Sequence, residues 1–189
     1  MSLNKRLFTG AASGTKVIIN NADAANYFAI NHTDNSGKWY FEVEYLAATT
    51  ANTLMIGLYS AGYVDGWQNT RARSYYASNG NRFKGTTSYS YGDAYGVGDI
   101  VGVAFNGDDD EITYYKNNSS QGVAFSSTEG DSNFGIQLST GLYGAEARIL
   151  LGSSEWNYSA PSGFNEWTDS KDAYDTDDVT TSGSSKVAG

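Results

Sequence analysis

The sequence predicts an all-β protein, an antiparallel β-sandwich, and two stretches carry most of that prediction. Residues 39–45 read Trp-Tyr-Phe-Glu-Val-Glu-Tyr, so apolar and aromatic side chains alternate with more polar ones. This period of two is typical of a strand that buries one face. Residues 98–105 and 112–117 are two strand-like runs that flank the turn Asn-Gly-Asp-Asp-Asp-Glu at 106–111, which predicts a β-hairpin. Since positions 100–105 are apolar on both faces, we expect that strand near the middle of a sheet.

Composition favours the same fold class. The chain of 189 residues has 22 Gly, 15 Tyr and a single Pro, as many short strands joined by Gly, Asn and Ser turns would require. No window has a sustained helical repeat with capping residues. The length suits one domain with a sizeable core and, at most, tails.

The remaining strands follow in chain order from short apolar runs between turn residues. Two short strands at 16–20 and 27–30 precede the alternating strand at 39–46, and the Ala/Thr-rich turn at 47–52 leads into a strand at 54–59. A long aromatic and polar stretch, 60–95, is expected to hold short strands around 74–77, 81–84 and 88–91. After the hairpin come strands at 134–138 and 144–151. In the last, the apolar residues at 145, 147, 149 and 151 share one face.

Charge and residue content exclude several classes of function. The net charge of −9 argues against nucleic-acid binding, since phosphate contacts need clustered Lys and Arg. The absence of Cys removes disulfides, thiolate metal sites and cysteine nucleophiles. No apolar run is long enough for a membrane span, and the N-terminus has no apolar signal core, so we expect neither membrane insertion nor a signal peptide.

The chain resembles the SPRY domain in the order of four motifs. These are Gly-Lys-Trp-Tyr-Phe-Glu-Val at 37–43, Gly-Asp-Ile-Val-Gly-Val at 98–103 leading to Ile-Thr-Tyr-Tyr-Lys-Asn at 112–117, Gly-Val-Ala-Phe at 122–125, and a looser match from Leu151-Gly152 to 156–164. The resemblance spans about residues 37–167. It implies an N-terminal arm with the first short strands at 1–36, the SPRY-like sandwich at 37–167, and an acidic Ser/Thr/Asp-rich tail at 168–189. The Leu-Asp-Pro segment that precedes many animal SPRY domains is absent, and the chain looks more like the stand-alone SPRY-like domains of phage and microbial proteins.

The resemblance also implies a function. A SPRY-like protein of this kind is expected to be a non-enzymatic protein-interaction module. The expected setting is a phage or viral particle, as a surface, decoration or tail-associated component in assembly or host attachment. Its partners would then be other virion chains or a host surface molecule, with a homo-oligomer possible, and its location the virion, or otherwise the cytoplasm. No cofactor is expected.

The aromatic and polar stretch is the candidate binding surface, because Tyr, Trp, Arg and Asn are enriched at recognition surfaces. It also resembles the variable loop region through which SPRY domains bind partners, and three of the five arginines of this acidic chain lie in it. The candidate partner-binding residues are Trp67, Arg71, Arg73, Tyr75, Tyr76 and Asn79. The alternative is that Trp67 and Tyr75 simply pack beneath a long loop. If the first surface is wrong, the binding edge is expected at the acidic turn, 108–111.

Two further functions remain open. A carbohydrate-binding module on the same sandwich would present two or three coplanar exposed aromatics. A glycoside-active enzyme would use Glu42 and Glu44, which are ~6.5 Å apart along one strand face, within the range for a carboxylate pair. The further acid that β-sandwich glycosidases usually carry on that strand is missing, since Leu46 and Ala47 stand there. We therefore expect a solvated strand face and no catalytic residues.

Metal binding is not expected either. The acidic run Asp108–Glu111 carries oxygen ligands that calcium prefers, but consecutive residues of a tight turn do not converge on one ion, and an Asp-rich hairpin tip is the simpler interpretation. The single histidine, His32, has no nucleophile motif beside it and is expected in a surface loop.

Overall fold

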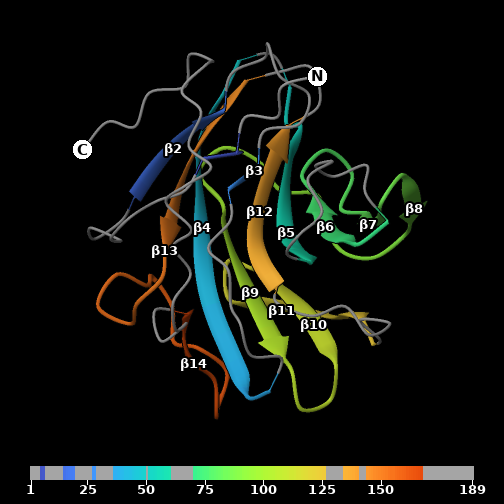
Figure 1. Ribbon diagram of the computed structural model, residues 1–189. Helices are drawn as coiled ribbons and strands as arrows, with labels where there is room; N and C mark the ends of the chain where they lie inside the picture. Colours follow the sequence, from blue (N-terminus) through green and yellow to red (C-terminus); the bar gives the residue numbers. More distant parts are fainter. Residues whose placement is uncertain are drawn as a thin grey trace.

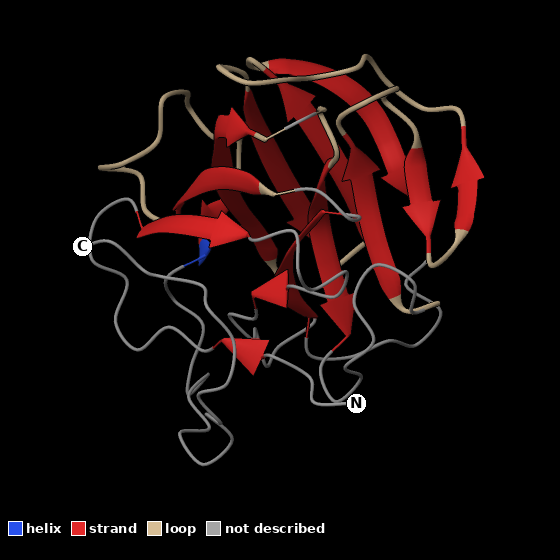
Figure 2. Cartoon of the chain, turned by 90° about the horizontal axis from the view of Figure 1, so that it is seen from above, coloured by secondary structure: helices blue, strands red, loops and turns tan. Residues whose placement is uncertain are grey.

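A computed structural model shows two β-sheets packed face to face as a sandwich (Figure 1). It describes residues 36–49, 51–60, 70–126, 134–140 and 144–167, together with the backbone of three short strands: β1 (Lys5–Arg6), β2 (Thr15–Ile19) and β3 (Tyr27–Phe28). Predictions made for Trp67, His32 and the tail at 168–189 lie outside the described residues. Strands account for nearly all of the regular structure that is described (Figure 2).

The first sheet has seven strands in the order β11-β10-β9-β4-β13-β2, with the short β14 paired to β4. Besides β2, its strands are β4 (Lys38–Ala48), β9 (Ile100–Asn106), β10 (Glu111–Lys116), β11 (Ser119–Phe125), β13 (Ala145–Leu150) and β14 (Asn165–Glu166). Neighbours on the main path are antiparallel, whereas β14 runs parallel to β4.

The second sheet has five strands in the order β12-β5-β6-β7-β8, with antiparallel neighbours. They are β5 (Leu54–Ser60), β6 (Ala72–Tyr76), β7 (Arg82–Lys84), β8 (Thr87–Tyr89) and β12 (Phe134–Thr140). The strands β1 and β3 pair in parallel as a separate two-stranded sheet. The expected antiparallel all-β sandwich is therefore confirmed, while β1, β14 and the full length of β11 were not predicted.

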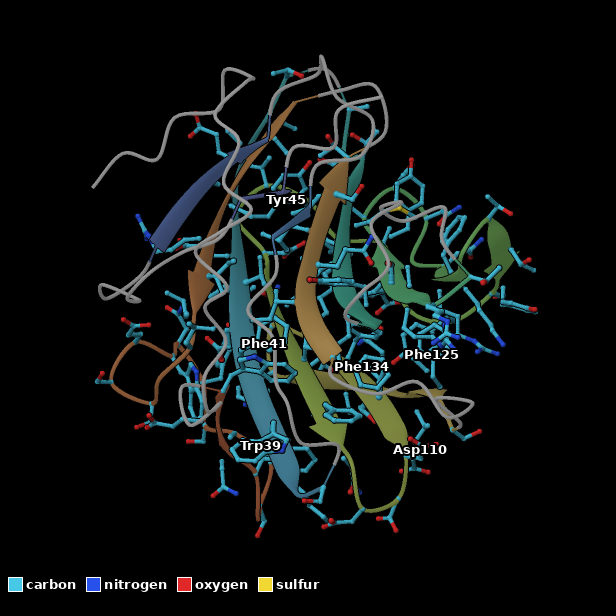
Figure 3. All side chains as sticks on the ribbon, viewed as in Figure 1. Trp39, Phe41, Tyr45, Asp110, Phe125 and Phe134 are labelled. Carbon is cyan, nitrogen blue, oxygen red and sulfur yellow. The ribbon has the colours of Figure 1, made fainter. Side chains whose placement is uncertain are left out.

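The core lies between the two sheets and contains the residues that the alternating pattern placed inside. Phe41, Val43, Val101, Val103 and Phe105 are fully buried. Ile149 is buried beside them, and each such side chain contributes about 1.5–3 kcal/mol by leaving water. Trp39, also predicted inside, is only half-buried at the end of the core, where its Nε1 donates to the Ser36 carbonyl at 2.8 Å. Figure 3 shows Trp39, Phe41 and Tyr45 spaced along β4.

The opposite face of β4 differs from the prediction. Tyr40 and Glu42 were expected on a solvated face, yet their exposed fractions are 1% and 0%. The chain that follows β13 covers them: the Trp156 ring packs edge-on to Tyr40 at 5.0 Å, and the backbone amides of Asn157 and Tyr158 donate to the Glu42 carboxylate. We refer to residues 152–166 as the C-terminal strap. Glu44, on the same face, is half-exposed.

The acidic turn is a hairpin tip between β9 and β10, as predicted. Asp108 Oδ1 accepts a hydrogen bond from the Gly37 amide at 2.8 Å, and the Gly107 amide donates to the Gly37 carbonyl at 2.7 Å. Asp109 is bonded to Asn106 within the turn, and Asp110 adopts a positive φ of 62°. The acidic residues therefore close the hairpin and tie it to the start of β4.

A layer of tyrosines fills one end of the sandwich interior. Tyr95 donates to the carbonyls of Leu54 and Tyr75, at 2.9 and 2.8 Å, and Tyr114 donates to the carbonyl of Arg73 at 2.8 Å. The Tyr75 hydroxyl donates to the Asp93 carbonyl. The hydroxyls of Tyr75, Tyr95 and Tyr114 thus each find a backbone acceptor, which is the condition for placing tyrosine in a core.

Because these tyrosines are buried, we expect the protein to unfold at alkaline pH. Burial raises the pKa of Tyr95 and Tyr114 well above the ordinary 10.0, and burial raises the pKa of Tyr91 to about 12. Their contribution to stability is complete below about pH 10 and is lost as the pH rises toward the folded-state values, because only the unfolded chain releases these protons. Tyrosinate absorbance and circular dichroism, followed in one alkaline titration, are expected to change together for this set. Complete tyrosine ionisation with a native spectrum would contradict the prediction.

Candidate partner-binding surface

The strands β6, β7 and β8 form the end of the five-stranded sheet that is remote from β12, and they contain most of the predicted binding stretch. Both faces of β6 are buried along Ala72–Tyr75. Arg73 and Tyr75 share the face toward the other sheet, where they contact Phe125 and Tyr114 and are 1% and 0% exposed. The Arg73 guanidinium donates to the carbonyls of Thr70 and Ala72, at 2.7 and 3.3 Å. Arg73 and Tyr75 therefore support this side from within, and a partner could not touch them directly.

The other predicted binding residues that are described lie at the surface. Arg71 and Tyr76 are half-buried and Asn79 is exposed in the turn between β6 and β7. The Tyr76 ring packs edge-on against Phe83 at 5.6 Å, and Asn79 Oδ1 accepts a hydrogen bond from the Asn81 amide at 3.0 Å. These contacts hold the turn in a defined shape. Arg71 lies at the other end of β6, immediately before Ala72. We call Arg71, Tyr76 and Asn79 together the turn surface.

Charge is segregated on this side of the sandwich. Residues 70–91 contain four cationic side chains and no Asp or Glu, although the whole chain has 21 acidic and 12 basic residues. The four are Arg71, Arg73, Arg82 and Lys84. A basic region in an acidic protein favours an anionic group on the partner.

Arg82 was part of the stretch noted in the sequence, but its position could not be inferred there. Its guanidinium carbon lies 4.8 Å from the centre of the Tyr89 ring and 5.2 Å from that of Phe125. Tyr89 lies opposite Arg82 on the neighbouring β8, whereas Phe125 belongs to β11 at the edge of the other sheet. The one feature of the sequence that pointed to this arginine is the absence of Asp and Glu from residues 70–91.

The carboxylates considered for catalysis are engaged in structural contacts. Glu42 Oε2 accepts the Asn157 amide at 2.7 Å, while Oε1 accepts the Tyr158 amide and the Tyr40 hydroxyl, both at 3.1 Å. Glu44 forms an ion pair with Arg148 at 2.7 Å. A buried carboxylate with both oxygens bonded offers a glycoside no approach, so this pair does not form a glycosidase site.

Other features of the described residues bear on the remaining alternatives. Among them, no group of three or more His, Asp or Glu side chains is placed to hold a metal ion. Tyr89 is the one aromatic among their exposed large hydrophobic side chains, so they do not present the coplanar aromatics of a carbohydrate-binding face. The same part of the chain contains no helix of the length and apolarity needed to cross a membrane.

The geometry thus defines a class of protein: an antiparallel β-sandwich of two packed sheets. A family model described as the SPRY domain matches residues 38–154. The chain belongs to the SPRY domain family, whose members are generally protein-interaction modules and typically non-catalytic.

Comparison with solved structures supports the fold. The SPRY domain of human HERC1 matches with a TM-score of 0.54 and 16% identity, over 73% of this chain and 84% of that one. A comparison with curated proteins finds none that matches.

Proposed function

We propose that this chain binds a protein partner through the turn surface, Arg71, Tyr76 and Asn79. The observation that carries the proposal is that an arginine, a tyrosine and an asparagine lie at the surface of a region without acids, in a family of interaction modules. Aromatic rings and guanidinium groups give large contact area with few rotatable bonds, which suits them to the centre of an interface. Trp67 precedes this surface in the chain and is proposed to belong to it.

We further propose that the setting is a phage or viral particle, in which the chain is a surface, decoration or tail-associated component. The partner would be another virion chain or a host surface molecule. This setting rests on the resemblance to stand-alone phage and microbial SPRY-like domains. Mass spectrometry of purified particles tests it: the chain should be present at a fixed ratio to the major capsid protein. Its recovery only from the cytoplasm would contradict a virion role.

The binding surface is tested by the double variant Arg71→Ala with Asn79→Ala. We expect affinity for the partner to fall by about 2–4 kcal/mol in the free energy of binding, the range for a pair of interface hot spots. The matched control is Arg148→Ala with Asn157→Ala, which removes the same two residue types from the seven-stranded sheet and the C-terminal strap. Quantitative capture of partners by each tagged variant is the measurement. Equal capture by the parent and the Arg71/Asn79 variant would place the binding surface elsewhere.

A further inference from the structure

Arg82 is held between rings that come from both sheets of the sandwich. The β7–β8 register places it opposite Tyr89, and its guanidinium also lies over Phe125 of β11 (Figure 3 labels Phe125 on this side of the molecule). A guanidinium that stacks on aromatic rings keeps its N–H donors at its rim, where a planar acceptor can reach them. The arrangement fixes the orientation of the group before any ligand arrives.

The donors of Arg82 have no acid to bind within the described part of the chain. The ion pairs found there are Lys116–Asp99, at 3.6 Å, and Arg148–Glu44, at 2.7 Å, and neither involves β7. Arg148 is thus paired with a carboxylate, whereas no described carboxylate is paired with Arg82. Arg82 is half-buried and the two rings supply no acceptor, so a carboxylate ligand would give its N–H donors a charged partner that the described residues do not provide.

A second guanidinium strengthens the positive potential at this point. Arg73 lies over the same Phe125 ring, with its guanidinium carbon 5.8 Å from the ring centre. Two cations around one ring favour an anion between the sheet edges.

We propose that Arg82 is the carboxylate-binding site for an extended acidic segment of a protein partner. The Asp or Glu of that segment forms a bidentate pair with the guanidinium, and an adjacent apolar side chain packs on Tyr89. Tyr89 is 43% exposed and lies on β8, directly opposite Arg82. The inference rests on the proposed function, because it assumes a protein partner, and it adds the chemistry that the partner must present.

The test uses the full chain and a short fluorescein-labelled peptide of alternating aspartate and valine, with fluorescence anisotropy as the readout. The parent should bind this peptide and should bind the matched asparagine–valine peptide much more weakly. Arg82→Gln is expected to weaken binding by about tenfold or more, since a bidentate charge-assisted pair is lost. Arg82→Lys should also weaken it, because lysine keeps the charge but not the planar fork. The control Arg148→Gln makes the same change in charge and should bind as the parent does.

Three outcomes would overturn the proposal. The first is equal binding by the parent and Arg82→Gln, with thermal melting showing both folded. The second is equal affinity for the asparagine peptide. The third concerns the chain's own acidic tail and uses a full-length variant in which four tail aspartates are changed to asparagine: Asp172, Asp175, Asp177 and Asp178. If the parent does not bind the peptide but this variant does, and its binding is lost on Arg82→Gln, the ligand of Arg82 is the tail. Because the peptide assay needs no natural partner, its failure is distinct from failure of the capture experiment on the turn surface.

Discussion

Replacing Trp167 by alanine is expected to lower the free energy of unfolding by about 3–5 kcal/mol, the usual range for deleting a large buried aromatic. Trp167 is 1% exposed and packs edge-on against Phe41 at 5.1 Å, with Phe105 at 6.5 Å. The family match ends at residue 154, so this tryptophan completes the core from beyond it. Since domains of this size are marginally stable, such a loss should leave a large unfolded fraction.

Urea denaturation followed by far-ultraviolet circular dichroism measures the effect without relying on tryptophan fluorescence. Trp156→Ala is the matched control. Trp156 is half-buried on the outer face of β4, where its Nε1 donates to the Leu150 carbonyl at 3.2 Å. It should lose clearly less stability than Trp167→Ala. Equal losses, or a loss below about 1 kcal/mol for Trp167→Ala, would show that Trp167 does not complete the core.

Replacing Glu42 by alanine is expected to lower the free energy of unfolding by about 2–4 kcal/mol and to loosen the C-terminal strap. Two backbone amides and the Tyr40 hydroxyl lose their acceptor, and each donor left without a partner costs about 1–3 kcal/mol when buried. Glu42→Gln should also destabilise, because its amide nitrogen would face a backbone N–H where the carboxylate has an oxygen. Hydrogen exchange at the amides of Asn157 and Tyr158 should accelerate first.

Glu44→Ala provides the comparison for Glu42 on the same strand and face. Its ion pair with Arg148 is 30–40% exposed, and such pairs contribute about 0–1 kcal/mol. Melting curves of the two variants should therefore differ clearly. Similar stability for both would mean that Glu42 does not anchor the strap.

The same strand shows how far sequence reasoning reaches. The period of two correctly placed Phe41 and Val43 inside, because that pattern depends only on neighbours along the chain. It placed Glu42 in solvent, because the amides that cover it follow 115 and 116 residues later. A local pattern can tell which residues share a face, but not whether a distant segment will cover that face.

The candidate site illustrates a different limit. Tyrosine and arginine content drew attention to residues 60–95, but the same residue types serve cores and interfaces. Only the contacts across the sandwich show that Tyr75 and Arg73 point inward, toward Tyr114 and Phe125 of the other sheet. Likewise, Arg82 and Phe125 belong to different sheets, so their contact could not be predicted from the spacing of residues in the sequence.

The strands that border the proposed Arg82 site also bear on solubility. β8 has only three residues, and β11 carries register shifts against β10 and a positive φ of 85° at Gly122. Short or bulged edges make poor templates for another strand, so β8 and β11 disfavour extension of their sheets by another chain at these two edges. A ligand on this side is then recognised by side chains rather than by continued backbone pairing. Its binding should weaken as salt screens the guanidinium.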